Sequence, residues 1–110
     1  MKLIIAIVQD EDTSRLINKL MESGFSATKL ATTGGFLKAG NTTLLIGVDD
    51  ERVSAAIAVI EKVCKSRRQM TPVTTSQTGA SGGGYSPYPV EVTVGGATVF
   101  ILSVEQFVKM

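Results

Sequence analysis

Two kinds of apolar pattern run along this chain, and together they predict a mixed fold of strands and helices. Residues 2–8 form a continuous apolar run rich in isoleucine, which is typical of a central strand. The next stretch has helical periodicity and ends at Gly24, a usual position for a glycine past a helix. Its apolar face consists of Leu16, Ile17, Leu20 and Met21. Residues 25–32 and 43–48 are predicted to be the second and third strands.

The middle of the chain repeats this order of strand, acidic group and helix. The run at 44–48 leads into acidic residues at 49–51, as the first strand leads into acidic residues at 10–12. We interpret both groups as helix starts, because carboxylates there cap free N–H groups and favour the helix dipole. Apolar residues between Val53 and Cys64 form one face of a second helix. This pattern favours an α+β, ferredoxin-like β-α-β-β-α-β fold with an antiparallel sheet.

The periodicity stops at residues 66–89, which are rich in threonine, serine and glycine. Such a stretch buries little surface, so we expect a long flexible loop there. Residues 90–94 and 97–102 are then predicted to form a hairpin that turns at Gly95 and Gly96. The last residues, 104–110, are expected to form a short helical turn. The whole chain is therefore expected to be one domain with a long glycine-rich loop before its last hairpin.

Composition narrows the possible partners and the compartment. The chain has 110 residues, 44% of them apolar, and a net charge of +1, which fits a globular protein without a nucleic-acid partner. No apolar run approaches the roughly 20 residues that span a membrane. The apolar start lacks a small-residue cleavage site, so we expect a cytoplasmic protein. The one cysteine, Cys64, excludes an internal disulfide and lies on the predicted core face of its helix.

Several common chemistries are missing from the sequence. There is no histidine, so the commonest general base and zinc ligand are absent. Helix capping is a sufficient explanation for the acidic groups, and we predict no metal site and no cofactor. There is no Gly-x-x-x-x-Gly-Lys-Ser/Thr motif either. Binding without turnover therefore fits the residues better than hydrolysis does.

Residues 31–43 combine groups that suit a ligand with a phosphate and a flat base. Gly34 and Gly35 can bring bare N–H groups close to an anion. An aromatic ring, an aliphatic side chain, a cation and an amide follow, namely Phe36, Leu37, Lys38 and Asn41. A plain glycine-rich turn, with Phe36 and Leu37 folded back onto the core, explains the pattern as well.

The segment Thr-Lys-Leu-Ala-Thr-Thr-Gly-Gly-Phe-Leu at 28–37, with further matches at 4–10 and 87–100, resembles the PII-like cyclic-di-AMP receptor proteins of Gram-positive bacteria. The resemblance implies a homotrimer that binds cyclic-di-AMP in clefts between neighbouring subunits. It implies ligand contacts at Thr28, Gly35, Phe36, Leu37, Asn41, Gly47 and Phe100. In these roles an aromatic or aliphatic side chain packs on adenine, and the asparagine amide pairs with a base edge. Ordinary core packing is the alternative for Phe100, and an exposed strand position for Thr28.

The chain departs from this family at two positions near the expected phosphates. Relatives often carry arginine at position 26 and a glutamine in the C-terminal tail, whereas this chain has Ser26 and ends in Val-Lys-Met. Losing a charged hydrogen bond costs about 1.5–3 kcal/mol of binding free energy unless another cation replaces it. We therefore add Ser26, Lys38 and Lys109 as further candidate contacts.

These features favour a non-enzymatic second-messenger receptor whose loops order on binding and so change the surface shown to a downstream protein. The alternatives are a PII-type sensor of ATP or ADP, a small ferredoxin-like phosphate-binding enzyme such as an acylphosphatase, and a structural trimer without a ligand. The ATP sensor needs more cations than this stretch supplies. The enzyme needs an arginine in the glycine loop, and none is present.

Overall fold

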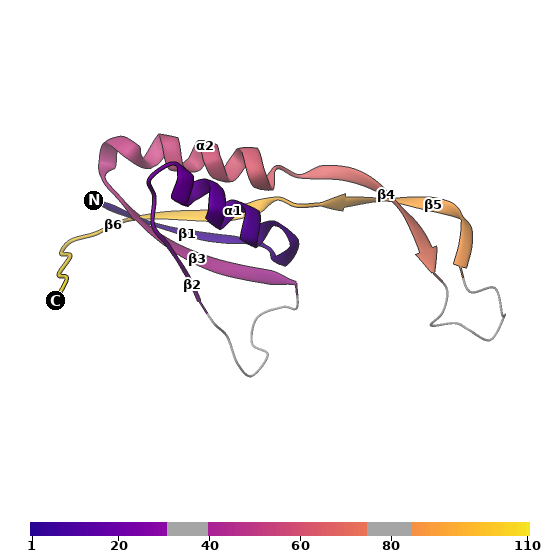
Figure 1. Ribbon diagram of the computed structural model, residues 1–110, viewed down its shortest axis with the longest axis horizontal. Helices are drawn as coiled ribbons and strands as arrows, with labels where there is room; N and C mark the ends of the chain where they lie inside the picture. The colour runs from indigo at the N-terminus through magenta and orange to yellow at the C-terminus, as the bar shows by residue number, and fades with distance from the viewer. Residues whose placement is uncertain (31–39, 75–84) are drawn as a thin grey trace.

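Six strands, two α-helices and one short 3₁₀ helix make up the described part of the chain (Figure 1). The structure is a computed structural model, and it describes residues 1–30, 40–74 and 85–110. The order is β1 (Lys2–Gln9), α1 (Asp10–Glu22), β2 (Ala27–Lys29), β3 (Asn41–Val48), η1 (Asp50–Arg52), α2 (Val53–Cys64), β4 (Arg67–Thr74), β5 (Tyr85–Val94) and β6 (Ala97–Ser103).

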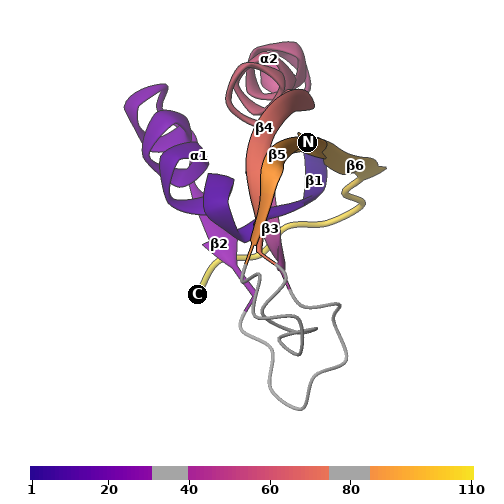
Figure 2. The ribbon, with the colours of Figure 1, turned by 90° about the vertical axis from the view of Figure 1, so that its right-hand side faces the viewer.

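The body of the molecule is a four-stranded sheet with the order β2-β3-β1-β6, in which all neighbouring strands are antiparallel. Both α-helices lie side by side on the same face of this sheet (Figure 2). Without β4 and β5, the element order is β-α-β-β-α-β. The predicted α+β, ferredoxin-like class is therefore confirmed.

The core lies between the sheet and the two helices. Alternate residues of β1 point into it, because side chains of a strand alternate between faces: Ile4, Ala6 and Val8 are at most 1% exposed. Leu16 and Leu20 fill the core from α1, as predicted. Met21 was expected beside them but is 63% exposed, since it lies past the edge of the buried stripe. Gly24 follows α1 with φ of +85°, which confirms its role in ending the helix.

The opposite face of the sheet, here called the open face, carries apolar side chains without a covering helix (Figure 2). Leu3, Ile5 and Ile7 of β1 alternate with the core residues and are half-buried. Phe100 and Leu102 of β6 pair with Ile5 and Leu3, so they share this face. They are 52% and 45% exposed.

β4 and β5 form a separate antiparallel ribbon. The prediction of a loop at 66–89 is therefore wrong for residues 67–74 and 85–89, which are strands. Residue 66 lies outside any strand or helix, and residues 75–84 lie outside the described residues. The apolar pattern did not indicate these strands because none of the ribbon residues whose side chains are described, 67–70 and 91–94, is buried. Met70, for example, is 59% exposed. The ribbon projects from the body along the long axis of the molecule (Figure 1).

The predicted hairpin of 90–94 with 97–102 is also wrong. β5 pairs with β4, and β6 continues onto the free edge of β1. Gly95 and Gly96 join them with φ values of +82° and +91°, in the region that favours glycine. The two glycines therefore connect a strand of the ribbon to a strand of the four-stranded sheet, and they do not form a hairpin turn. Residues 104–110 contain no helical turn, although one was expected.

A buried carboxylate, Asp12, ties the ribbon to the body. The acidic residues 10–12 were expected to cap α1, but Gln9 is the N-cap residue and makes no side-chain cap. Asp12 is instead 1% exposed, and its Oδ1 accepts hydrogen bonds from Arg67 (2.9 Å) and Arg15 (3.2 Å). The Asp12 carboxylate raises the pKa of Arg67 above its usual range. Buried charge is tolerated only with such partners.

We predict that Asp12→Asn lowers the free energy of unfolding by about 2–4 kcal/mol, because two arginines then lose their buried counter-charge. Urea denaturation followed by circular dichroism, at one fixed protein concentration, measures this loss. Asp49→Asn is the matched control, since Asp49 is exposed and makes no side-chain cap on η1. Equal stability of the two variants would contradict the assigned role of Asp12.

Candidate ligand-binding site

Four of the predicted contacts line one cavity of about 630 Å³ on the open face, here called the edge cavity. They are Ser26, Thr28, Gly47 and Lys109. The other lining residues are Met1, Leu3, Leu45, Val104, Phe107 and Val108. The cavity is large enough for a small organic ligand and mixes apolar walls with hydroxyl and ammonium groups.

Strand register explains why these residues meet. Thr28 of the edge strand β2 is paired with Leu45 of β3. Gly47 lies two residues further along β3, so it faces the same side of the sheet. Leu3 is the partner of Gly47 on β1. One edge of the sheet thus supplies the floor of the edge cavity.

Gly47 leaves space in this floor. Its backbone is not among those with positive φ, so the conformation does not require glycine. A Cβ atom at this position would lie 3.2 Å from the terminal methyl group of Met1. A glycine inside a strand often marks a close approach by a ligand or another chain. Here the missing side chain keeps the cavity open.

The C-terminal tail forms the opposite wall. The N–H of Val104 donates a hydrogen bond to the carbonyl oxygen of Met1 (3.1 Å), which fixes the start of the tail. Phe107, Val108 and Lys109 then line the cavity. Lys109 brings a positive charge to the same cavity as Ser26. Lys109 is the one basic side chain among the described residues that line the edge cavity.

Asn41 lies in a different place, at the start of β3. It lines a polar hollow of about 410 Å³, here called the loop-end hollow, together with Asp10, Thr13, Ser14, Lys29, Leu30 and Thr42. The Thr42 hydroxyl donates to Asp10, and the Asp10 N–H donates to the Gly40 carbonyl (2.7 Å). Asn41 and Gly47 are six positions apart along β3, which is a distance of about 20 Å. The two are not neighbours within one chain.

Phe100 is exposed on the other edge of the sheet. Thr28 pairs with Leu45, Leu45 with Ile5, and Ile5 with Phe100, so these four form one row across the open face. Three strand spacings, or about 14 Å, therefore separate Thr28 from Phe100. Core packing, the alternative for Phe100, does not occur, because its side chain faces away from the helices and is half exposed.

The remaining candidates, Gly35, Phe36, Leu37 and Lys38, lie outside the described residues. So does most of the predicted ligand loop at 31–43, although its last three residues belong to β3.

Sequence reasoning missed the apolar and tail residues of the edge cavity, among them Met1, Leu45 and Phe107. Leu45 had a usable signal, since it alternates with the core positions Leu44 and Ile46 and so faces away from the helices. Phe107 is 63% exposed, which sequence alone does not reveal.

The described residues include no group of three or more His, Cys, Asp or Glu side chains arranged to hold a metal ion. Nor does any helix in the described ranges have the length and apolar character needed to cross a membrane. Cys64 is 1% exposed in the core, which confirms its predicted packing role. Burial raises the pKa of its thiol to about 11, and the negative charge of Asp12 adds to this effect.

The fold and the edge cavity define a small ligand-binding protein with a ferredoxin-like body. Over residues 1–110 the chain matches the sequence model of the family described as "Cyclic-di-AMP receptor", and it belongs to this family. It is similar to a solved structure described as a functionally unknown protein from Pediococcus pentosaceus ATCC 25745. That similarity has 42% sequence identity and a TM-score of 0.76, and covers 99% of this chain and 96% of the other.

We predict that Cys64 is alkylated by iodoacetamide far more slowly in the native protein than after unfolding in urea. At pH 8, a shift from 9.0 to about 11 lowers the thiolate fraction about 100-fold, and burial slows access further. The native state also keeps this proton while the unfolded state releases it, so stability falls between about pH 9 and 11. Equal alkylation rates would contradict the buried position.

Proposed function

We propose that the protein is a non-enzymatic signal-transduction receptor that binds cyclic-di-AMP between the subunits of a homotrimer. The observation that carries the proposal is the edge cavity, in which Thr28, Gly47 and Lys109 meet in a chain of the cyclic-di-AMP receptor family. The absence of histidine from the whole sequence supports binding without turnover, since the commonest general base is missing.

Each group of the edge cavity has a role that suits this ligand. The space beside Gly47 accepts a purine, and Leu3 and Leu45 offer it apolar surface. The Thr28 and Ser26 hydroxyls donate to phosphate oxygens, and Lys109 supplies the positive charge. Asn41, which lies outside the edge cavity in the loop-end hollow, is proposed to pair with the edge of an adenine, as asparagine does in base recognition. Gly35, Phe36 and Leu37, which lie between Thr28 and Asn41 in sequence, are proposed to contact the same ligand.

The opposite edges of the sheet support a site shared between subunits. Thr28 and Gly47 belong to the β2 side, whereas Phe100 belongs to β6, about 14 Å away in the same row. In a ring of three identical chains, the β2 edge of one subunit meets a different surface of the next. A ligand held there touches Thr28 of one subunit and Phe100 of its neighbour.

The open face supports the same assembly. Its apolar residues lack a covering helix, and Phe100 and Leu102 are about half exposed in the single chain. Contiguous apolar surface of this kind usually marks an interface. We propose that the three open faces pack together around the trimer axis, with the helices outside.

Calorimetric titration with cyclic-di-AMP is the first test, with cyclic-di-GMP and ATP as comparison ligands. We expect saturation near one cyclic-di-AMP per subunit and no comparable heat from the other two. Asn41→Ala should weaken binding by about 5- to 100-fold, since a paired base edge contributes about 1–3 kcal/mol. Gly47→Val should abolish binding by filling the cavity while the fold is retained.

Two controls match these variants. Asn18→Ala changes the only other asparagine, which is exposed on α1. Ala97→Val also introduces a valine into the sheet, but on β6 and outside the edge cavity. Both should bind as the wild type does. If the folded protein gave no heat with cyclic-di-AMP, the receptor proposal would fail. ATP binding of equal strength would favour the nucleotide-sensor alternative.

Mixed trimers test whether two subunits share the site. Gly47→Val and Phe100→Ala chains should each bind poorly alone, while Ile101→Ala, next to Phe100 but on the other face, should bind normally. When the two defective chains are unfolded and refolded together in equal amounts, about a quarter of the interfaces combine two intact halves. Binding should therefore return at about 0.25 ligand per subunit. No recovery would show that one chain holds the whole site.

A further inference from the structure

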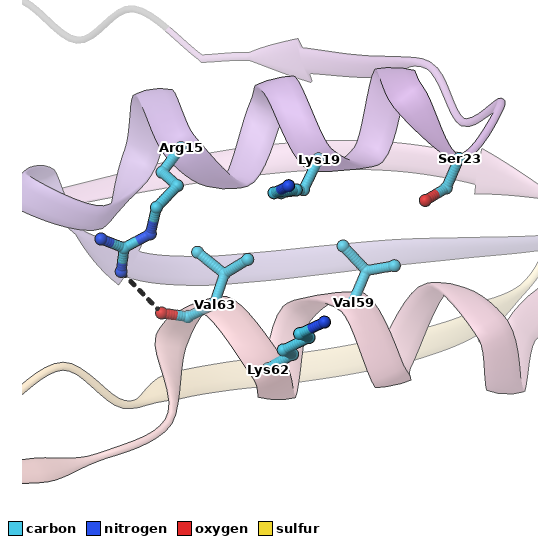
Figure 3. A pocket seen from close by; sticks show the side chains of 6 residues that line it. All are labelled: Arg15, Lys19, Ser23, Val59, Lys62 and Val63. Atoms are coloured by element: carbon cyan, nitrogen blue, oxygen red, sulfur yellow. Dashed lines mark hydrogen bonds between the residues drawn. The ribbon is translucent and has the colours of Figure 1, made fainter.

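A second concave surface lies on the other side of the molecule, in the groove between α1 and α2 (Figure 3). Its volume is about 330 Å³, and we call it the helix groove. One wall comes from α1 and the residue that follows it, through Arg15, Lys19 and Ser23. The other wall comes from α2, through Val59, Lys62 and Val63. None of these six residues belongs to the edge cavity or the loop-end hollow.

The helix groove concentrates positive charge. It holds three basic residues and no acidic one, whereas the whole chain has a net charge of only +1. Lys19 has one weak partner, Glu22, at 3.8 Å between exposed side chains. In the described parts of the chain, no ion pair joins Lys62 to an acidic residue. Both lysines are exposed, so their charges are available to another molecule.

Arg15 is held in place, unlike the lysines. Its Nη2 atom donates to the carbonyl oxygen of Val63 across the groove (3.0 Å) and to Asp12 (3.2 Å), as Figure 3 shows for the first contact. This bond joins the C-terminal end of α2 to α1 across the groove. Val63 is 8% exposed and Val59 half-buried, so they form an apolar floor between the cations.

The spacing of the groove residues indicates what fits it. Arg15, Lys19 and Ser23 follow one another at intervals of four residues, which place side chains on one helix face about 6 Å apart. Carboxylates at positions i and i+4 of a second helix have the same spacing. An aliphatic side chain between them would reach the valine floor. An amphipathic helix that places its apolar side in a groove of another protein is a common mode of recognition.

We propose that the helix groove is a docking surface for an acidic amphipathic helix of a partner protein. Charge complementarity is the feature that selects this occupant: two exposed lysines, Lys19 and Lys62, border a narrow apolar floor. Beside them lies Arg15, which is paired with Asp12. The groove lies on the helix side of the sheet, so it stays accessible when the open face is covered. The proposal does not depend on the identity of the ligand in the edge cavity.

The test uses a synthetic peptide of about 16 residues, stapled to hold a helix and labelled with fluorescein. It carries glutamates at i and i+4 on either side of a leucine stripe, and a matched peptide carries glutamines instead. Fluorescence anisotropy measures binding to the full-length protein at low salt and at high salt. We expect the glutamate peptide to bind at least tenfold more tightly than the glutamine peptide, and this preference to shrink at high salt.

Variants of the protein test whether the glutamate peptide binds in the helix groove. Lys19→Gln and Lys62→Gln should each weaken binding of the glutamate peptide about threefold, and the double variant about tenfold, because each removes one exposed charge contact. Lys65→Gln is the control, since Lys65 is exposed just past α2 but outside the groove. Arg15 is left intact because it also holds Asp12 and Val63.

Several results would overturn the proposal. These are equal binding of the two peptides, no effect of the double variant, an equal effect of Lys65→Gln, or no binding at all. Vesicles containing phosphatidylserine form a further arm: if they bind the protein through Lys19 and Lys62 while the glutamate peptide does not, the groove is a membrane contact. Titration of the double variant with cyclic-di-AMP should be unchanged, which separates this test from that of the proposed function.

Discussion

A buried carboxylate, Asp12, links the body of this protein to the base of its ribbon. Asp12 cannot remain charged in the core without partners, and it finds them in Arg15 of its own helix and Arg67 at the base of the ribbon. The same helical turn makes other links. Asp10 binds Thr42 at the start of β3, and the Gln9 side chain accepts a hydrogen bond from the Gly95 N–H (2.7 Å). The first turn of α1 therefore joins the end of the ligand-loop segment to the junction of the two sheets.

The body of the fold could be predicted from sequence because its elements bury one face. Apolar periodicity reports contact with a core, which β1, α1, β3 and α2 all make. The described side chains of the ribbon, at residues 67–70 and 91–94, are not buried, so its strands gave no such signal. The hairpin predicted at Gly95 and Gly96 was wrong for a related reason. A glycine pair indicates positive φ, but it does not indicate which strands pair with each other. Asp12 was interpreted as a cap because sequence does not show that Arg67 approaches it.

The candidate site, too, could be predicted only in part from the sequence. Resemblance to the family supplied Thr28, Gly47 and Phe100, whereas the structure adds their arrangement: Thr28 and Gly47 on one edge of the sheet, Phe100 on the other. No local pattern connects Ser26 with Lys109, because a tail at the end of the chain brings them to one cavity. The two faces of the sheet also differ in chemistry. The open face is mostly apolar, and the helix layer carries a basic groove, so the proposed self-assembly and the proposed partner binding use different surfaces.

The projecting ribbon has a mechanical consequence. The radius of gyration is 18.1 Å, whereas a compact chain of this length has about 13 Å, because β4 and β5 extend beyond the body. Eight strand residues reach about 26 Å from the base. If the ribbon rotates by about 10° about its base, where Arg67 contacts Asp12, the far end of β4 moves by about 4.5 Å. The same rotation displaces the far end of the ribbon more than its base, because the displacement grows with distance from the body.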